Sequence, residues 1–559
     1  MSERGAPTST SSDRAPALEA VRTRLMVAVF LFLGAFLLLG ARMVELGLAA
    51  PERAQREAGG LPTYEVKRAD ITDRNGLVLA TNLETSSLYA DPAKVLDAPD
   101  AAGKIAAVLP EISKAELLAN LQAGKRFVWV KRKLTPQQIV AVNSIGLPGF
   151  FYRTEEERVY PQGPLFAHAV GFVDVDGRGL AGVENYFDRA LSDPAYGGAD
   201  VKLTLDARVQ FALRDEMAKA LADFDAAGAA GLVLDVASGE VLALVSLPDF
   251  DPNHPNAASA DQKFNRAVQG VYELGSIFKT VTFAIGFDTG RVSMEGGYDA
   301  TKPLTVGKFT IRDDHPKNRF LTVPEIFIYS SNIGAAQMAL DIGTDNQRAY
   351  FKRLGLLSAP LFEMTEVGRP LYPNPWRTVN TMTAAYGHGI AVSPLQMADA
   401  IAATINGGIL IPATLVAEGE RGPGQGTRVF SEDVSAKMRA LMRLTVIEGT
   451  GKQADIEGYR VGGKTGTAEK PGAGSYQRNA LLSSFVGVFP MDAPRYLVFI
   501  VLDEPTGTAE TFNFSGGGWV AAPAVGNVIV RIAPMLGVAP RPREVNGLKD
   551  IAYLVAGSR

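Results

Sequence analysis

The strongest structural signal in this chain is the run Gly458-Tyr-Arg-Val-Gly-Gly-Lys-Thr-Gly-Thr-Ala468. Its first half is strand-like, and Lys464-Thr-Gly-Thr467 follows directly. A lysine ammonium and two threonine hydroxyls suit the carboxylate of a substrate, and Gly466 would allow the substrate backbone to approach closely. The backbone N–H of Thr467 could supply one half of an oxyanion hole. Taken alone, the run is also compatible with an ordinary strand edge, so its meaning depends on the segments upstream.

The segment Ser276-Ile-Phe-Lys279 contains a candidate nucleophile and a candidate base. Ser276 follows Gly275 at the start of a helical pattern, where free backbone N–H groups can stabilise an oxyanion together with the N–H of Thr467. Lys279 is three residues further along and therefore lies on the same helical face. A buried lysine close to other cations can lose its proton and act as a base. On its own, this spacing could equally mark the cap of a surface helix.

A third short motif, Ser330-Ser331-Asn332, lies between the other two. Ser330 and Asn332 fall in a turn or short loop, so both side chains could point into one cleft. A hydroxyl can relay a proton, and an amide can hold a substrate peptide bond. Such a sequence is also a common helix cap. The three motifs in this order indicate acyl transfer through an active serine, rather than two caps and a strand edge.

Composition and length exclude several other classes of protein. The chain has 559 residues with 47% hydrophobic and 21% charged residues, which favours two or more folded globular units. A net charge of −4 gives no support for nucleic-acid binding. There are no cysteines, and the four histidines show no metal-binding spacing, so we expect structural histidines, no metal and no cofactor.

An uncharged apolar run, Leu25–Ala41, lies near the start of the chain. With Met43 and Val44 it is just long enough to cross a bilayer as a helix. Arg22 and Arg24 precede it, so we expect the N-terminus to stay in the cytoplasm and the rest to be exported across the inner (plasma) membrane. The alternative is a cleaved signal peptide, since Gly47-Leu-Ala49 has the form of a cleavage site. The length of the run favours a single-pass anchor.

Hydrophobic periodicity predicts a mixed α/β protein. In the first half we expect strands at 77–80 and 87–89, a turn at 73–76 and a helix at 111–124. In the second half we expect strands at 201–206, 231–236, 240–246, 458–468, 481–489 and 495–502, with helices at 207–224, 276–290, 323–340, 345–354, 378–406 and 431–448. Strand pairs at both ends with helices between them predict one antiparallel sheet flanked by helices.

The predicted organisation is a disordered cytoplasmic tail (1–24), a transmembrane helix (25–44), a juxtamembrane linker (45–62), an elongated strand-rich pedestal of the dimerisation type (63–200), a catalytic domain (201–540) and a C-terminal tail (541–559).

From residue 25 to about 535 the chain resembles class B penicillin-binding proteins, which are peptidoglycan D,D-transpeptidases. Besides the three motifs, the family-like phrases are Arg68–Gly76, Tyr89–Pro92, Arg158–Pro161, Ala167–Phe172, Gly179–Glu184, Asn265-Arg266, Tyr272–Gly275, Gly387–Gly389, Ser393–Gln396 and Gly516–Pro523. The resemblance implies a transpeptidase domain of the penicillin-binding and β-lactamase type. Two positions depart from the family pattern: Leu274 replaces a proline before Gly275, and Ala69 replaces a glycine.

The resemblance also implies a reaction. The catalytic residues would be Ser276, Lys279, Ser330 and Lys464, and the substrate-binding residues Asn332, Thr465, Gly466 and Thr467. The implied substrate is a D-alanyl-D-alanine stem peptide, and β-lactams are expected to acylate the same serine. No glycosyltransferase domain is evident before residue 200, so the implied partners are a membrane glycan polymerase and other cell-division proteins.

Within the family, the Ser330-x-Asn332 form and the phrases Tyr89–Pro92 and Gly458–Val461 favour the division-specific, septal enzyme of the penicillin-binding protein 3 type. The elongation-specific enzyme is the alternative. A D,D-carboxypeptidase or β-lactamase and a penicillin-sensing receptor share the motifs, but the large N-terminal segment and the single anchor count against them.

Overall fold

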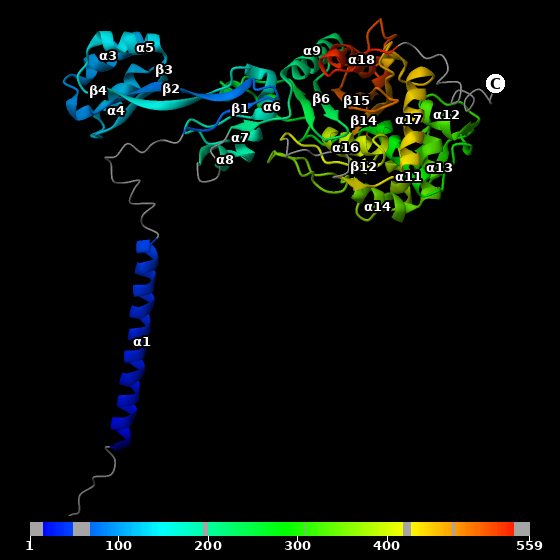
Figure 1. Ribbon diagram of the computed structural model, residues 1–559. Helices are drawn as coiled ribbons and strands as arrows, with labels where there is room; N and C mark the ends of the chain where they lie inside the picture. Colours follow the sequence, from blue (N-terminus) through cyan, green and yellow to red (C-terminus); the bar gives the residue numbers. More distant parts are fainter. Residues whose placement is uncertain are drawn as a thin grey trace, which may run out of the picture. The chain divides into compact units, whose positions relative to one another are not determined.

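The computed structural model describes residues 15–48, 67–193, 200–307, 309–416, 426–471 and 476–541. The chain forms two units, 1–65 and 66–559. The described part of the first unit is one helix, α1 (Ala15–Leu48; blue in Figure 1). Its apolar side chains from Val29 to Met43 are largely exposed.

The predicted boundaries around the apolar run need correction. The tail 1–24 was expected to be disordered, yet α1 already begins at Ala15. The alanine, leucine, glutamate and arginine residues before the apolar run favour helix, so the helix starts ahead of that run. The helix also continues to Leu48, through the first residues of the predicted linker. The remainder of the linker and residues 1–14 lie outside the described residues.

In the described part of the chain a single helix, α18 (Gly517–Met535), is long and apolar enough to cross a membrane. More than half of it is buried (56%) against the sheet described below, as expected for a core helix of a globular domain. By the same measure the apolar stretch of α1, Val29–Met43, is shorter.

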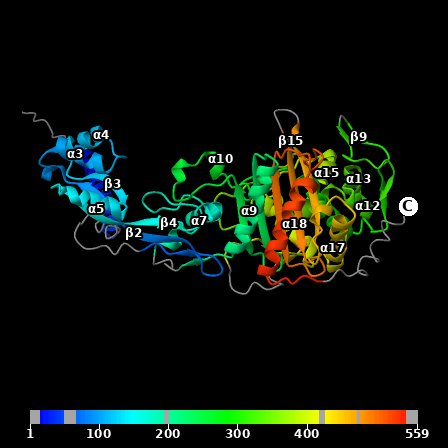
Figure 2. The ribbon, with the colours of Figure 1, turned by 90° about the horizontal axis from the view of Figure 1, so that it is seen from above.

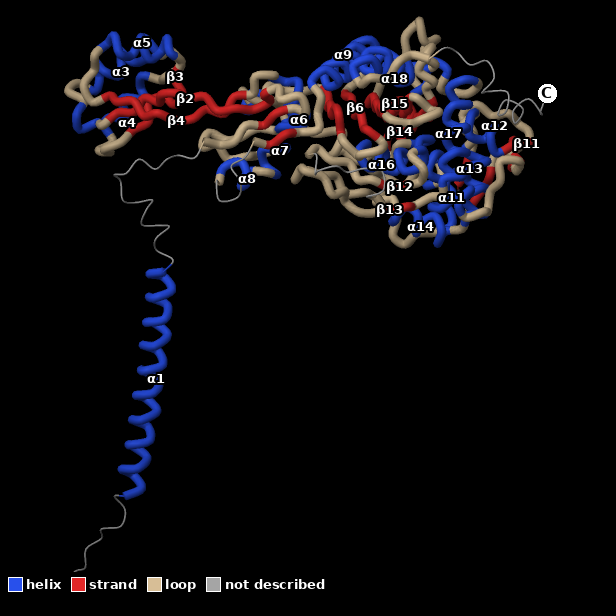
Figure 3. The backbone as a smooth tube through the Cα atoms, viewed as in Figure 1, coloured by secondary structure: helices blue, strands red, loops and turns tan. Residues whose placement is uncertain are grey.

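The N-terminal part of the second unit is built on a sheet in the order β3–β2–β1–β5, and β4 also pairs with β2. Figure 3 shows β2 and β4 as long neighbouring strands. The strands of this sheet are β1 (Ile71–Thr72), β2 (Val78–Ala90), β3 (Val128–Leu134), β4 (Phe150–Val159) and β5 (Val201–Lys202). The predicted strands 77–80 and 87–89 are two ends of the single strand β2, which pairs with β1 at its start and with β4 from Thr81 to Ala90. One face is covered by α3 (Ala98–Val108), α4 (Lys114–Gln122) and α5 (Pro136–Ile145), which bury Leu88 and Ala90.

Three family-like phrases meet at a buried ion cluster at the base of this sheet. Glu184, fully buried on α7 (Gly182–Tyr186), accepts from Arg68 at 2.7 Å and from Arg158 at 2.6 Å. The short helices α6 (Ala167–Val170) and α8 (Asp188–Ser192) flank it. The main-chain carbonyl of Ala69 accepts from Arg158 at 2.8 Å, a contact that alanine and the family's glycine can make equally.

The strand predicted at 201–206 is shorter than expected and belongs to a different sheet. Only Val201–Lys202 is a strand, and it pairs in parallel with β1. Beyond it the chain turns toward the second half, where the N–H of Thr204 bonds to the carbonyl of Leu415. The first sheet is therefore completed by residues from beyond the predicted domain boundary.

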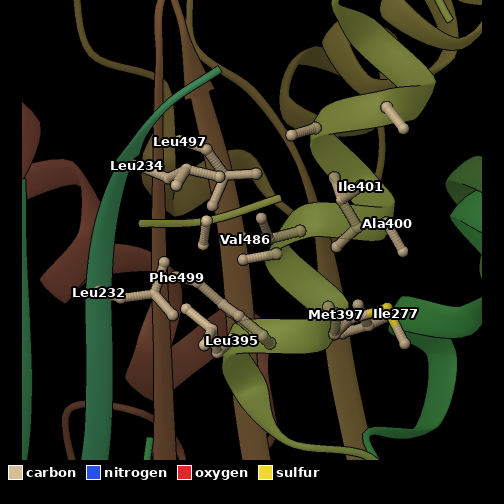
Figure 4. Packing of buried hydrophobic residues seen from close by; sticks show 14 of the residues in the cluster. Leu232, Leu234, Ile277, Leu395, Met397, Ala400, Ile401, Val486, Leu497 and Phe499 are labelled. Atoms are coloured by element: carbon tan, nitrogen blue, oxygen red, sulfur yellow. The ribbon is translucent and has the colours of Figure 1, made fainter. Parts of the chain in front are cut away.

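The C-terminal part contains an entirely antiparallel sheet in the order β14–β15–β16–β6–β7. The sheet lies beside α18 (Figure 1, Figure 2). Its strands are β6 (Gly228–Asp235), β7 (Val241–Leu247), β14 (Gly462–Pro471), β15 (Tyr476–Phe489) and β16 (Tyr496–Asp503). Successive residues enter different cores: Val233 packs with α9 (Ala207–Asp223) and α18, whereas Leu232 and Leu234 pack with α16 (Pro394–Ile405). Figure 4 shows Leu395, Met397 and Ile401 of α16 between these strands and Ile277. Both faces are covered, which explains why these strands are continuously apolar and confirms the predicted α/β class.

Several helices are shorter than predicted because glycine, proline or a strained residue interrupts them. The region 323–340 is divided into α12 (Val323–Ile328) and α13 (Asn332–Ile342), and 378–406 into α15 (Thr378–Ala384) and α16. Helix α18 is an addition that the analysis of periodicity did not predict; its three leading glycines and two internal prolines obscure the helical pattern. The remaining elements are α10 (Ala260–Lys263), α11 (Phe278–Asp288), α14 (Thr344–Arg353), α17 (Glu432–Ile447) and the short strands β8 (Gly297–Asp299), β9 (Leu304–Val306), β10 (Phe309–Ile311), β11 (Phe320–Thr322), β12 (Ile409–Leu410) and β13 (Thr427–Arg428).

Candidate active site

The candidate nucleophile Ser276 lies on a single turn of 3-10 helix, Gly275–Ile277, that leads into α11. This turn is held between two backbones. A side chain at Gly275 (φ +56°) would come within 2.6 Å of the carbonyl of Thr467, and one at Gly387 within 2.2 Å of the carbonyl of Gly275. Both glycines are therefore required by close packing, and the nucleophile turn is fixed directly against strand β14.

The unusual residue Leu274 precedes this turn. Its side chain is 1% exposed, and its φ of −81° is within reach of proline. Leucine at this position therefore has the backbone conformation that the family's proline would impose, and it adds a buried apolar side chain to the core.

Lys279 lies at the centre of the candidate site and is fully buried. Its Nζ lies within hydrogen-bond distance of four oxygens: Oγ of Ser276 at 2.9 Å, Oδ1 of Asn332 at 2.7 Å, and the carbonyl and Oγ of Ser330 at 2.5 and 3.1 Å. Burial lowers the pKa of Lys279 from 10.5 to about 7, against the opposing effect of Asp313 and Asp314. At neutral pH a large fraction of this amine is uncharged and can accept the proton of Ser276.

Ser330 occupies a strained turn between two lysines. Its φ is +61°, a conformation that costs a residue with a side chain about 1 kcal/mol or more. Its Oγ accepts from Nζ of Lys464 at 2.9 Å and from Nζ of Lys279 at 3.1 Å. Lys464 is also fully buried, and burial, followed by the charge of Lys279, lowers its pKa well below the usual value. Hydrogen-bond contacts thus run from Ser276 through Lys279 to Ser330, and Lys464 contacts Ser330 from its own side.

The two threonines of β14 lie next to the N-terminus of α18. Oγ1 of Thr467 accepts from the N–H of Gly517 at 3.1 Å, so its own hydrogen remains available to a ligand. Oγ1 of Thr465 bonds to Oγ1 of Thr450 at 2.7 Å. A helix N-terminus beside two hydroxyls favours an anion such as a carboxylate.

The structure gives Gly466 a reason that the sequence did not suggest. A side chain there would lie 2.3 Å from Oγ of Ser484, 2.7 Å from Ile277 and 2.7 Å from the carbonyl of Leu274. Glycine at this position allows β14 to pack against the nucleophile turn. The predicted approach of a substrate backbone to Gly466 stays a prediction.

Sequence reasoning missed Asp313, which holds the Ser330–Asn332 turn. Its carboxylate accepts from Oγ of Ser331 at 2.7 Å and from the N–H groups of Asn332 and Ile333 at 2.6 and 2.9 Å. It lies in a polar loop 17 residues before Ser330, in no motif, so only the tandem pair Asp313-Asp314 could have drawn attention to it. Thr450 was missed for the same reason, whereas Gly517 lies in the phrase Gly516–Pro523, to which no role was assigned.

Three of the four histidines have local contacts that fit a structural role. His168 bonds through Nε2 to the carbonyl of Gln262 at 2.8 Å, and His254 contacts Asp251. His388 packs edge-on against Tyr386, and burial lowers the pKa of both His168 and His388 to about 4. Among the described residues, no group of three or more His, Asp or Glu side chains is placed to hold a metal ion.

Comparison with known proteins agrees with this geometry. Residues 229–529 match the family described as the penicillin binding protein transpeptidase domain, and residues 63–193 match the penicillin-binding protein dimerisation domain. The chain is 42% identical to the probable peptidoglycan D,D-transpeptidase FtsI of Caulobacter vibrioides, over 92% of this chain and 89% of the relative. It is 33% identical to the probable peptidoglycan D,D-transpeptidase PenA of Neisseria gonorrhoeae, over 85% of each. A crystal structure of penicillin binding protein 3 from Mycobacterium tuberculosis, in complex with aztreonam, has the same fold: the TM-score is 0.67 at 24% identity, covering 86% of this chain and 98% of that one.

Proposed function

The chain belongs to the penicillin-binding transpeptidase family, and from this premise we propose that it is a serine D,D-transpeptidase that cross-links peptidoglycan stem peptides during septal cell-wall synthesis. The single observation that carries the proposal is the contact of 2.9 Å between Nζ of the buried Lys279 and Oγ of Ser276. Lys279 has a pKa of about 7, low enough for a base at neutral pH, and Ser276 lies at the start of a helix, which supports these two roles.

In the first half of the reaction, Oγ of Ser276 attacks the carbonyl carbon of the penultimate D-alanine while its proton passes to Nζ of Lys279. The tetrahedral oxyanion is held by the backbone N–H groups of Ser276 and Thr467. The packing of Gly275 on the carbonyl of Thr467 supports this pairing because it brings the two backbones together.

Breakdown of the tetrahedral intermediate requires a proton on the leaving amine. Ser330 delivers it, because its Oγ lies within hydrogen-bond distance of both Lys279 and Lys464. D-Alanine departs and Ser276 remains esterified. The amine of a neighbouring stem peptide then attacks the ester and forms the cross-link, and the same groups return the proton to Ser276.

Substrate binding falls to the residues around this path. Thr465 and Thr467 hold the terminal carboxylate next to the N-terminus of α18. Asn332 holds the peptide backbone of the substrate; its Oδ1 already accepts from Lys279 and its Nδ2 donates to the carbonyl of Arg312 at 3.0 Å, so the amide is fixed before substrate arrives. β-Lactams present a strained amide beside a carboxylate and acylate Ser276 by the same route.

In the cell, α1 anchors the protein once in the inner membrane, with the N-terminus in the cytoplasm and the catalytic domain outside. The exposed apolar side chains from Val29 to Met43 and the arginines before them support this orientation. The partners are a membrane glycan polymerase and other division proteins. The Ser330-x-Asn332 motif and the similarity to FtsI favour a role in the septum over one in elongation.

The test is labelling of the full chain by a fluorescent penicillin, with Ser276→Ala as the variant. We expect stoichiometric labelling of the native chain at Ser276 and none in the variant; a labelled variant would exclude this nucleophile. Incubation with peptidoglycan precursors and a glycan polymerase should give cross-linked dimers, whereas free tetrapeptide alone would indicate a carboxypeptidase. Mid-cell placement of a fluorescent fusion supports septation, and lateral placement supports elongation.

A further inference from the structure

Arg312 and Asp313, which precede β11 and belong to none of the three motifs, form hydrogen bonds to the Ser330–Asn332 turn. The Asp313 carboxylate takes hydrogen bonds from Oγ of Ser331 and from the N–H groups of Asn332 and Ile333, at 2.6 to 2.9 Å. The main-chain carbonyl of the preceding residue, Arg312, accepts from Nδ2 of Asn332 at 3.0 Å. Hydrogen bonds to a carboxylate are about twice as strong as neutral ones, so Asp313 is the principal restraint on this turn.

The candidate base depends on the same turn. Two of the acceptors around Nζ of Lys279, the carbonyl of Ser330 and Oδ1 of Asn332, belong to the turn and lie at 2.5 and 2.7 Å. Ser330 adopts a φ of +61°, which persists only where the surroundings impose it. If the turn relaxed, the acceptors would move and the amine of Lys279 would lose its position against Ser276.

Resting on the proposed role of Ser276, we propose that Asp313 is a positioning residue for acylation: its carboxylate holds the Ser330–Asn332 turn, and the turn holds the amine of Lys279 against the nucleophile. Among the described residues Asp313 bonds to Ser331, Asn332 and Ile333 and not to Ser276, so it acts through its neighbours.

The charge of Asp313 gives this role a signature that a purely structural residue lacks. The charged or titratable groups that face Lys279 are Lys464, His388, Asp313 and Asp314. The two carboxylates raise the pKa of Lys279 against the larger effect of burial. Removal of either charge lowers this pKa, so more of the amine is neutral in acid and the acid limb of the acylation profile moves to lower pH.

Asp314 is a matched control, because in the described part of the chain it makes no hydrogen bond to the turn although it acts on the same lysine. Asp313→Asn should both lower the plateau of the pH profile of acylation, which is the rate above the acid limb, and move the acid limb to lower pH. Asp314→Asn should move the limb alone. Ser331→Ala, which removes one bond to Asp313 and the cap of α13, should lower the plateau alone.

The experiment measures the second-order rate of acylation of the full chain by a fluorescent penicillin from pH 5.5 to 9, with thermal unfolding of each variant as a check on folding. We expect about a tenfold lower plateau for Asp313→Asn with its acid limb at lower pH, and a plateau within about twofold of the native value for Asp314→Asn. Asp313→Glu keeps the charge but displaces the hydrogen bonds, so it should lower the plateau with the limb in place.

A native plateau in Asp313→Asn or Asp313→Glu would overturn the proposal. So would a lowered plateau in Asp313→Asn with the limb unmoved, because that outcome is explained by loosened structure alone. Mass spectrometry of the labelled native chain separates this inference from the proposed function: absence of label on Ser276 removes the latter, whereas native labelling with unaffected Asp313 variants removes only the former.

Discussion

Replacing Lys279 with methionine should abolish acylation and at the same time remove a pH-dependent cost from the folded state. Lys279 is fully buried, and its pKa falls from 10.5 in the unfolded chain to about 7 in the folded protein. Between pH 7 and pH 10.5 the unfolded chain therefore keeps a proton on Lys279 that the folded protein releases. For a base with a lowered folded pKa the cost is complete below pH 7 and disappears above pH 10.5.

The size of this cost follows from the pKa values. Each pKa unit corresponds to ~1.4 kcal/mol, so the fall from 10.5 to about 7 corresponds to about 4 kcal/mol at neutral pH. Raising the pH from 7 to 9.5 removes about 3 kcal/mol of it. Methionine also leaves the carbonyl of Ser330 and Oδ1 of Asn332 without a donor, but that loss does not vary with pH and leaves the slope unchanged.

The assay compares thermal unfolding of the native chain and Lys279→Met between pH 7 and 9.5. We expect the melting temperature of the variant relative to the native chain to fall by about 5 °C as the pH rises. Lys302→Met, at an exposed lysine outside the site, supplies the baseline for general effects of pH. A constant difference between Lys279→Met and the native chain across this range would refute the lowered pKa, and with it the case for Lys279 as the base.

Two further predictions concern the packing of the site. Gly466→Ala places a methyl group within 2.3 to 2.7 Å of Ser484, Ile277 and Leu274, and should reduce the rate of acylation by penicillin about 100-fold. The control is Ser484→Ala, which deletes a buried hydroxyl without a hydrogen-bond partner and should react at the native rate. Equal rates for Gly466→Ala and the native chain would show that this contact does not matter. Glu184→Gln leaves Arg68 and Arg158 buried without their shared carboxylate and should lower the free energy of unfolding by about 3 kcal/mol or more. The same change at the exposed Glu432 should have little effect, and chemical denaturation measures both variants. A loss below about 1 kcal/mol for Glu184→Gln would contradict the role assigned to the ion cluster.

Much of the candidate site was predictable because its residues are tied to local backbone signals. Ser276 and Lys279 share a helical face by spacing alone, and the structure brings them to 2.9 Å. Lys464 follows a strand-like run, and β14 begins two residues before it. The contacts of Ser330 with Lys279 and Lys464 depended on tertiary folding, and the sequence could only order the three motifs along the chain.

What the sequence could not reveal depends on contacts between distant segments. Asp313 acts on residues 18 to 20 positions away through a loop with no periodicity. Helix α18 begins with glycines that pack on Thr467 and Ser484, so the residues that weaken its helical signal are the ones that its tertiary position requires. The short strand β5 shows the same principle, since its pairing with β1 across the predicted domain boundary is fixed by topology and not by composition.

The energetic costs of this site are concentrated in one place. Two lysines are fully buried within hydrogen-bond distance of one serine hydroxyl, and that serine has a left-handed backbone conformation. None of these features would persist in an isolated helix or strand, because each is unfavourable by itself. They persist because the elements that carry them are fixed by apolar packing. Helices α11 and α13 lie in one of the two large hydrophobic clusters, and β14 pairs with β15 in the sheet that both clusters cover. Proton transfer at this site therefore requires a rigid, well-packed protein around it. Substitutions that relieve the strain at Ser330 or the burial of Lys279 should raise stability only by sacrificing the proton path that makes Ser276 a nucleophile.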